Sequence, residues 1–277
     1  MSFDTVWFLS DYGLDDEFVG VVKAVIRAIA PDVTVGDVTH QIAPHDTRAG
    51  ALALARSMQY LTLVPSVVLA VVDPGVGSDR RAVAVEAGPA GDTDGEGVAA
   101  VLVGPDNGLL ASAVAMVGGA RRAVSLTNDD YHLPAPGPTF AGRDVFAPAA
   151  AHLCAGVDLA ELGELVDPIT LLPGILPLSR QEDGEVLGEV LWVDRFGNIQ
   201  LNVDPDDLLL MEDPLALVFG EKTRTAVRAR TYADLRTGQI GLVTDSYGLV
   251  SIALDRRSAA EELHIHAGDA ITIRPAE

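Results

Sequence analysis

The sequence predicts an α/β domain with a mostly parallel sheet over residues 1–180, followed by a smaller all-β barrel over residues 188–277. In the first part, short apolar runs alternate with segments of helical periodicity, which is typical of a mostly parallel sheet covered by helices. After "LSRQEDGE", short strands are divided by turn residues with little helix between them, as in small barrels and sandwiches. A chain of 277 residues that is 48% hydrophobic can fill a core in each part.

The elements expected in the first part follow in order along the chain. After the strand "TVWFLSD", apolar residues recur at helical spacing from Phe18 to Ile29, and Pro31 ends that helix. A later helix, "DVFAPAAAHL", has Thr139 and Asp144 as possible caps and is interrupted by Pro148. The other expected elements are the strands "VTVGDV" (33–38) and "SVVLAVVD" (66–73), the helix "TRAGALALARSMQYL" (47–61), a hairpin tip or surface excursion at "AGPAGDTDGEG" (87–97), and the strand, turn and helix of "EGVAAVLVGPDNGLLASAVAMVGG" (96–119).

The second part is expected to hold strands with only short connections. Each candidate is rich in β-branched or apolar residues and is bounded by turn residues. The candidate strands are "VLGEVLWVD" (186–194), "ALVFGE" (216–221), "TAVRART" (225–231), "QIGLVTDS" (239–246), "LVSIAL" (249–254) and "DAITIRP" (269–275).

Acidic residues stand at the ends of three predicted strands of the first part, as Asp11, Asp73 and Asp106. In parallel sheets, ligands bind at the carboxyl ends of the strands. The three positions therefore predict one shared site.

The stretch "VVDPGVGSDRR", Val71 to Arg81, ends an apolar strand in an acid and then turns through glycines to two arginines. In the simpler interpretation, Asp73 caps its own turn and the arginines lie in solvent. In the functional interpretation, Arg80 returns to Asp73, because a carboxylate at the end of a buried strand is costly unless it is paired.

Charge and composition limit the partners of the protein. A formal charge of −21 argues against nucleic acid and anionic membranes and favours a cationic small substrate, although acidity that serves only solubility explains it equally well. The apolar run "VWFL" is too short for a signal peptide or a membrane span, so a cytoplasmic protein is expected. The single cysteine, Cys154, excludes an internal disulfide and is expected to be buried and inert.

Several common cofactor motifs are absent from the sequence. No G-x-G-x-x-G follows the first strand, there is no P-loop, and His132 and His152 stand alone without a second ligand at metal spacing. No metal or cofactor is therefore expected. In "VDRFGNIQLNV", a hairpin turn is one interpretation, and an aromatic ring with an amide for a purine is the other.

Six stretches together resemble the S-adenosyl-L-methionine hydroxide adenosyltransferases, relatives of the fluorinating and chlorinating enzymes. They occur in the family's order and spacing and span nearly the whole chain: "SDYGLDDEFVGVVKAVI", "DVTHQIAPHDTRAGALAL", "AVVDPGVGSDRRAVAVE", "PDNGLL", "TFAGRDVFAPAAA" and "VDRFGNIQLNV". The resemblance implies a homotrimer with each site between one subunit's N-terminal domain and its neighbour's C-terminal domain. It also implies a hydrolase in which activated water attacks ribose C5′ of S-adenosylmethionine by nucleophilic substitution and gives adenosine and L-methionine, without a metal.

The resemblance also implies roles for single residues. Tyr247 departs from the halogenase arginine that meets the methionine carboxylate. The implied substrate contacts are Asp11 to the ribose hydroxyls, His45 beside the ribose, Asp16 and Asp194 near the methionine ammonium, Phe196 and Asn198 on the adenine side, and Ser246 at the methionine carboxylate. Asp15 or Asp16 as an ordinary helix cap is the simpler alternative.

The family's catalytic set is implied to be Asp73, Arg80 and a histidine in "TFHGRD", where this chain has Ala141. Two explanations are open: a natural variant that uses another base, or a histidine deliberately replaced by alanine, which the unchanged neighbouring residues favour. His132 is near in sequence but is expected in a loop. If the histidine at position 141 is the base that this chain lacks, we expect a low-activity enzyme that still binds S-adenosylmethionine nearly normally.

Three other functions compete with the hydrolase. A halogenase is disfavoured because those relatives lose the Asp-Pro-Gly-Val-Gly turn that this chain keeps at residues 73–77. A non-catalytic binder of adenosyl ligands fits the missing histidine. A metal-dependent nucleoside hydrolase fits the acid cluster "SDYGLDD".

Overall fold

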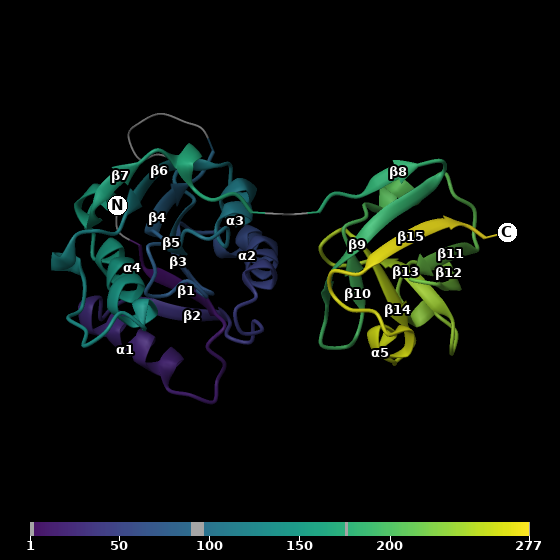
Figure 1. The fold of residues 1–277 in the computed structure, drawn as a ribbon, viewed down its shortest axis with the longest axis horizontal. Helices are drawn as coiled ribbons and strands as arrows, with labels where there is room; N and C mark the ends of the chain where they lie inside the picture. The colour runs from purple at the N-terminus through teal and green to yellow at the C-terminus, as the bar shows by residue number, and fades with distance from the viewer. Residues whose placement is uncertain (1–2, 90–96, 175–176, 277) are drawn as a thin grey trace. The chain divides into compact units, whose positions relative to one another are not determined.

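The computed structural model describes residues 3–89, 97–174 and 177–276. The chain divides into two compact units, Met1–Ile175 and Leu176–Glu277 (Figure 1). Strand β8 (Arg180–Glu182) pairs with β9 (Glu185–Val193) and so already belongs to the sheet of the second unit. Residues 90–96 of the expected hairpin tip or surface excursion lie outside the described residues.

The first unit is built on a seven-stranded sheet with the order β2-β1-β3-β5-β4-β6-β7. The first four strands in that order run parallel, whereas β4 and β7 run antiparallel to their neighbours. The sheet is therefore mostly parallel, as the sequence predicts. Its strands are β1 (Thr5–Ser10), β2 (Thr34–Thr39), β3 (Ser66–Val71), β4 (Ala82–Ala87), β5 (Ala100–Pro105), β6 (Ala120–Ser125) and β7 (Glu164–Val166).

Helices cover both faces of this sheet, because the central strands are apolar on both sides. In β3, Val67 and Leu69 belong to the core under one pair of helices, and Val68 belongs to the core under the other pair. Helices α1 (Phe18–Ile29) and α4 (Ala147–Cys154) lie on one side, and α2 (Thr47–Leu61) and α3 (Ala111–Met116) on the other (Figure 1).

Helix α1 begins after Glu17, whose side chain makes no capping hydrogen bond, so the alternative of a cap at Asp15 or Asp16 is wrong. A π-helical turn, η2 (Gly142–Phe146), runs directly into α4. Pro148 lies in the first turn of α4, where the π-helical turn gives way to α-helix, so the predicted interruption is a change of helix type and not a break.

The second unit is a closed β-barrel. Seven strands follow one another around it in the order β10-β14-β13-β12-β11-β15-β9, and pairing of β9 with β10 closes the ring, while β8 extends β9. One apolar core fills the barrel, and α5 (Ala259–Leu263) packs against it. The barrel strands are β9 (Glu185–Val193), β10 (Ile199–Leu201), β11 (Leu215–Phe219), β12 (Lys222–Ala229), β13 (Ile240–Thr244), β14 (Val250–Leu254) and β15 (Ala270–Pro275).

No helix within the described residues combines the length and apolar character needed to cross a membrane.

Candidate active site

A cavity of about 530 Å³ opens where β1 and β3 end in the first unit. We call it the Asp73 cavity. These two strands are neighbours in the parallel part of the sheet, so the residues that follow them meet at one edge. The polar and aromatic side chains of its wall include Asp11, Tyr12, His45, Asp73 and Phe140.

Asp73 and Arg80 form a two-point ion pair on this wall. The Nε of Arg80 donates to Asp73 Oδ1 at 2.8 Å, and its Nη2 donates to Asp73 Oδ2. The turn between them is held by backbone hydrogen bonds from Val76 to Asp73 and from Ser78 to Gly75. Only 6% of the Asp73 side chain and 14% of the Arg80 side chain are exposed, so both charges are largely withdrawn from water and need each other. The solvent-exposed arginine of the simpler interpretation is therefore wrong for Arg80.

Asp11 lies on the same wall as Asp73 and holds the loop that carries His45. Asp11 Oδ2 accepts a hydrogen bond from the backbone N–H of His45 at 2.9 Å. The backbone of His45 is left-handed, with φ +69°, which is uncommon for a residue with a side chain. Because Asp11 and His45 both line the Asp73 cavity, a ligand in the cavity can reach their side chains.

Tyr12 completes the floor of the Asp73 cavity, although the sequence did not single it out. Its ring packs edge-on against Phe140, with ring centroids 5.7 Å apart. Burial, helped by the carboxylates of Asp11 and Asp73, raises the pKa of the Tyr12 hydroxyl well above its usual value, so this hydroxyl keeps its proton. Its position directly after Asp11, at the end of a strand, is the signal that could have identified it.

Asp106 does not share this cavity, so the expectation of three acids in one site is wrong. The antiparallel pairing of β4 with β5 sets Ala82 against Pro105 and so brings Arg81 to Asp106. The Nε of Arg81 donates to Asp106 Oδ2 at 2.8 Å, and the other carboxylate oxygen accepts from the backbone of Leu172 at 2.8 Å. Asp106 thus anchors the end of the first unit.

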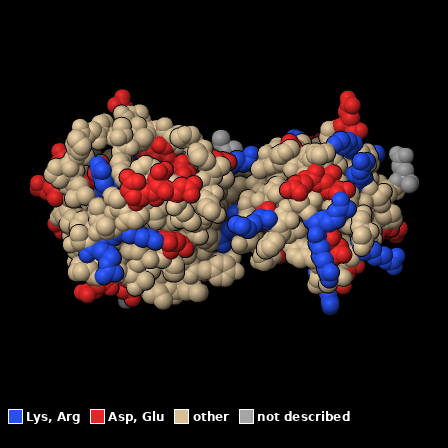
Figure 2. Space-filling view, turned by 90° about the horizontal axis from the view of Figure 1, so that it is seen from below, with Lys and Arg blue, Asp and Glu red and all other residues tan. Residues whose placement is uncertain are grey.

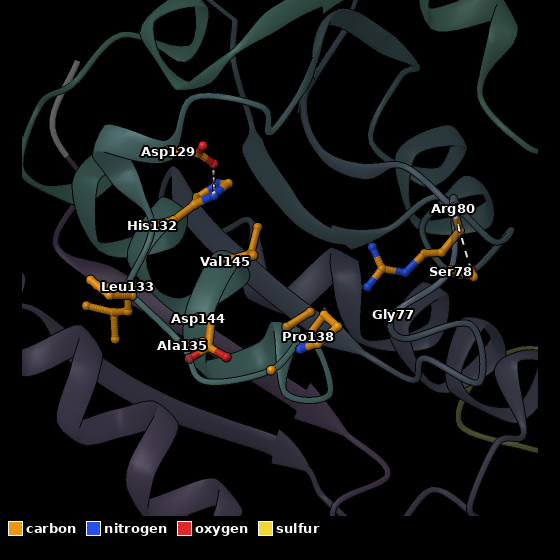
Figure 3. Close-up of a pocket in the computed structure, with 13 residues that line it drawn as sticks. Gly77, Ser78, Arg80, Asp129, His132, Leu133, Ala135, Pro138, Asp144 and Val145 are labelled. Atoms are coloured by element: carbon orange, nitrogen blue, oxygen red, sulfur yellow. Dashed lines mark hydrogen bonds and ion pairs between the residues drawn. The ribbon is translucent and has the colours of Figure 1, made fainter.

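Position 141 stands between the Asp73 cavity and a second cavity of about 600 Å³, because Ala141 lines both. We call the second one the His132 cavity (Figure 3). Ala141 is the residue before η2, whose first residue, Gly142, packs against Tyr12. A methyl group is all that this residue contributes between the two spaces.

Asp144, expected as a possible cap, lies inside η2 instead and pairs with its neighbour Arg143. The Nε of Arg143 donates to Asp144 Oδ1 at 2.6 Å, and its guanidinium carbon lies 5.0 Å from the centroid of the Phe140 ring. Arg143 lines the Asp73 cavity, and Asp144 lines the His132 cavity. Sequence reasoning missed Arg143 as a wall residue, because an arginine beside an aspartate also suits an exposed helix end.

In the second unit, Asp194 shapes the turn between β9 and β10. Its Oδ1 accepts from the backbone of Phe196 at 2.8 Å and of Asn198 at 2.9 Å, and its Oδ2 accepts from the Asn198 amide at 2.8 Å. Gly197 takes a left-handed φ of +82° that closes the turn. The turn presents the Phe196 ring to solvent, with 78% of the residue exposed. Such an exposed ring is available to stack on a planar ligand.

Ser246 lies in the neighbouring turn, between β13 and β14. Asp245 shapes this turn by accepting from the backbone of Tyr247 at 2.8 Å, and its Oδ2 accepts from the Gln200 amide of β10 at 2.5 Å. The Gln200 contact ties the Ser246 turn to β10, which also follows the Asp194 turn and pairs antiparallel with β14. Burial, with the nearby carboxylates of Asp194 and Asp245, raises the pKa of Tyr232.

The predicted site residues thus form two groups, one in each unit. Asp11, His45, Asp73 and Ala141 share the Asp73 cavity, with Arg80 bound to Asp73. The residues of the barrel turns form the second group: Asp194, Phe196, Asn198 and Ser246. Asp16 is exposed before α1 and does not line the Asp73 cavity.

Charge on the surface favours a cationic ligand. Acidic side chains gather beside a hollow on the face of the first unit that Figure 2 shows. Together with the net charge of −21, they attract cations toward this unit. Among the residues that the structure describes, no three His, Cys, Asp or Glu side chains are grouped to hold a metal ion.

Comparison with known proteins gives consistent matches along the chain. The model of the SAM hydroxide adenosyltransferase N-terminal domain matches residues 6–163, and that of the C-terminal domain matches residues 188–272. The (R)-S-adenosyl-L-methionine hydrolase of Salinispora tropica is 43% identical over 271 residues, covering 97% of this chain and 98% of the relative. A fluorinase of Nocardia brasiliensis is 26% identical, covering 96% of this chain and 95% of the fluorinase. The crystal structure of an uncharacterized conserved protein from Thermotoga maritima has a TM-score of 0.85 at 32% identity, covering 97% of this chain and 99% of that one.

Proposed function

The chain belongs to the SAM hydroxide adenosyltransferase family, and on that premise we propose that it hydrolyses S-adenosyl-L-methionine to adenosine and L-methionine. One observation carries the proposal: the buried Asp73–Arg80 ion pair stands at the same cavity as Asp11, a carboxylate that suits a ribose diol. A sulfonium substrate is a cation, which suits the acidic surface of the first unit.

In the proposed reaction, a water held at the Asp73–Arg80 pair attacks C5′ of the ribose. The new O–C5′ bond forms as the C5′–S bond breaks, sulfur keeps the bonding electron pair and becomes a neutral thioether, and the water loses one proton. In-line attack requires the water on the face opposite sulfur, so its fixed position supplies part of the acceleration. The guanidinium of Arg80 favours the developing hydroxide, and Asp73 keeps that guanidinium in place.

The remaining residues are proposed to bind the substrate. The Asp11 carboxylate accepts hydrogen bonds from the ribose hydroxyls, and His45 lies beside the ribose. Phe196 and Asn198 contact the adenine. The proposed contacts to the methionine part are Asp16 and Asp194 near the ammonium and Ser246 at the carboxylate. The reaction needs no cofactor or metal.

A homotrimer is proposed as the working form in the cytoplasm. In it, the Asp73 cavity of one subunit would receive the Phe196 and Ser246 turns of a neighbouring subunit. This arrangement explains why ligand-binding features occur in both units. Sedimentation of the purified protein measures the oligomer, and a strictly monomeric active enzyme contradicts it.

Product analysis in ¹⁸O-labelled water tests the proposed function. We expect adenosine that carries ¹⁸O at the 5′-hydroxyl, together with unlabelled methionine, with both forms of the sulfonium supplied separately because the relative is named for the (R) form. Free adenine, lost on chelation, would indicate the metal-dependent nucleoside hydrolase. A 5′-halonucleoside formed with chloride or fluoride would indicate a halogenase. Tight binding in calorimetry without any product would indicate a binding protein.

A further inference from the structure

The His132 cavity adjoins the proposed reaction site through Ala141 and Gly137, which line both cavities. Neither residue has a side chain larger than a methyl group. The space that a larger side chain at position 141 would fill is therefore open to the His132 cavity. That cavity of about 600 Å³ is large enough to hold water molecules.

Arg80 connects the two spaces from the other side. Its partner Asp73 lines the Asp73 cavity, whereas Arg80 itself lines the His132 cavity. Its guanidinium carbon lies 5.1 Å from the centroid of the Phe146 ring, which fixes the side chain across the boundary. Water beside the ion pair can therefore continue into the His132 cavity.

His132 faces this cavity and is held in place on several sides. Its Nδ1 lies 3.3 Å from Asp129 Oδ1, and its backbone N–H donates to Asp129 at 3.1 Å. The next residue, Leu133, donates its backbone N–H to Asp144 of η2 at 2.9 Å and ties the loop to the cavity wall. Only 17% of the His132 side chain is exposed.

The other ring nitrogen of His132 makes no hydrogen bond to any residue that the structure describes. In Figure 3, His132 and Arg80 stand on opposite sides of the cavity. The other charged groups on its wall are Asp129, behind the ring, and Asp144, which is neutralised by Arg143. An imidazole between a carboxylate and a cavity is a common proton acceptor near neutral pH.

We propose that His132, backed by Asp129, accepts the proton of the attacking water through water molecules in the His132 cavity. The inference rests on the proposed function. As O–C5′ forms and C5′–S breaks, one proton moves from the attacking water to a bridging water, and the bridging water gives one proton to Nε2 of His132. The positive charge that leaves the sulfonium thus arrives on the imidazolium, which later releases its proton to solvent.

Kinetics of His132→Gln in two backgrounds test this route. In the chain with Ala141, we expect turnover to fall at least about tenfold with little change in KM, since a proton acceptor acts mainly in the transition state. The part of the pH dependence of turnover that is due to His132 should disappear. In the Ala141→His background, the same change should alter turnover by less than about twofold, because the imidazole introduced at position 141 closes the passage and replaces the acceptor.

His152→Gln is the matched control. His152 packs against Tyr131 with ring centroids 4.9 Å apart and lines neither cavity, so its loss should leave the pH profile unchanged. If His132→Gln does not fold, Asp129→Asn is tested in its place. This variant removes the carboxylate that contacts the His132 imidazole, and it should change the pH profile of turnover.

The outcomes separate this inference from the proposed function. A parent chain that forms no adenosine overturns both. A parent that is active, with His132→Gln equally active and unchanged in pH profile, overturns this inference alone. An equal loss of turnover in both backgrounds shows that His132 is structural and also overturns it.

Discussion

Asp73 Oδ1 accepts a 2.8 Å hydrogen bond from Arg80 Nε, so a carboxylate and a guanidinium seven residues apart in sequence share one buried position. The turn between them needs Gly77 in a left-handed conformation, with φ +80°. Two guanidinium nitrogens of Arg80 each meet one carboxylate oxygen of Asp73, a bidentate geometry that an arginine can supply and a lysine cannot.

Arg80→Lys should lower turnover by about 10²-fold while KM changes little, because the charge remains but the fixed orientation toward the water is lost. Steady-state kinetics measure both constants. Arg81→Lys is the control, since Arg81 pairs with Asp106 outside the Asp73 cavity. Equal losses of turnover in the two variants would contradict a special role for Arg80.

Ala141→His should raise turnover at least about tenfold with little change in substrate affinity, because it supplies a proton acceptor beside the ion pair. Adding Asp73→Asn to that variant should remove most of the gain, since residues that act as a unit are not additive. Kinetics of these variants provide the measurement. Ala141→Gln, which fills the space without a base, should gain nothing.

The fold could be predicted from local patterns, because apolar periodicity alone separates strands from helices. The run "SVVLAVV" is apolar on both faces, and β3 is indeed buried on both sides of the sheet. Strand β4 ends at Ala87 and pairs antiparallel with β5, which begins at Ala100, as the hairpin-tip interpretation of residues 87–97 requires. The ends of α1 and α2 agree with the predicted runs 18–29 and 47–61, whereas neither of the two acids considered as caps of α1 caps it.

The site could be predicted only where residues are close in sequence. The Asp73 turn carries its own partner, so Arg80 was accessible to sequence reasoning. Asp106 was wrongly grouped with Asp73, because the antiparallel pairing that gives it Arg81 is a tertiary feature. The His132 cavity arises from packing of a loop against η2 and leaves no signal in the sequence.

Cys154 should be unreactive in the folded protein. Burial, and to a lesser degree the Asp4 carboxylate, raises the pKa of its thiol to about 12, and the thiolate is the reactive form. Iodoacetamide at pH 8 should therefore label Cys154 only as the protein unfolds. Fast labelling under conditions where circular dichroism shows an intact fold would contradict this.

The same group makes the free energy of unfolding depend on pH. The thiol of the unfolded chain, with a pKa of about 9, loses its proton before the folded one does as the pH rises, so this contribution to stability falls between about pH 9 and 12. The slope is at most about 1.4 kcal/mol per pH unit. Denaturant titrations at a series of pH values measure this dependence. Above pH 9 only, the free energy of unfolding of the parent should fall more steeply with pH than that of Cys154→Ala.

Phe196→Ala should raise KM about tenfold without lowering stability. The ring is exposed in the Asp194 turn and contributes little to the barrel core, whereas stacking on adenine is worth about 1–3 kcal/mol. Kinetics and a thermal melt measure the two effects. Leu210→Ala, at a residue that is 100% exposed, should change neither.

Gly142→Ala tests how the fold supports the Asp73 cavity. A methyl group at Gly142 would overlap the Tyr12 hydroxyl and lie 3.0 Å from the Tyr12 ring carbon that carries it. Because Tyr12 packs against Phe140, its ring has little room to retreat, and we expect a loss of about 1–3 kcal/mol in the free energy of unfolding.

Removing the hydroxyl should restore much of that loss. In the double variant Gly142→Ala, Tyr12→Phe, the overlap with the oxygen is gone, so a double-mutant cycle should give a favourable coupling of at least about 1 kcal/mol. Urea denaturation of the four proteins measures it. Gly20→Ala is the control, because a methyl group there meets no atom within 4 Å in α1 and should stabilise the protein by about 0.5–1 kcal/mol. Additive losses in the cycle would mean that Gly142 is required for the π-helical turn itself and not for its fit against Tyr12.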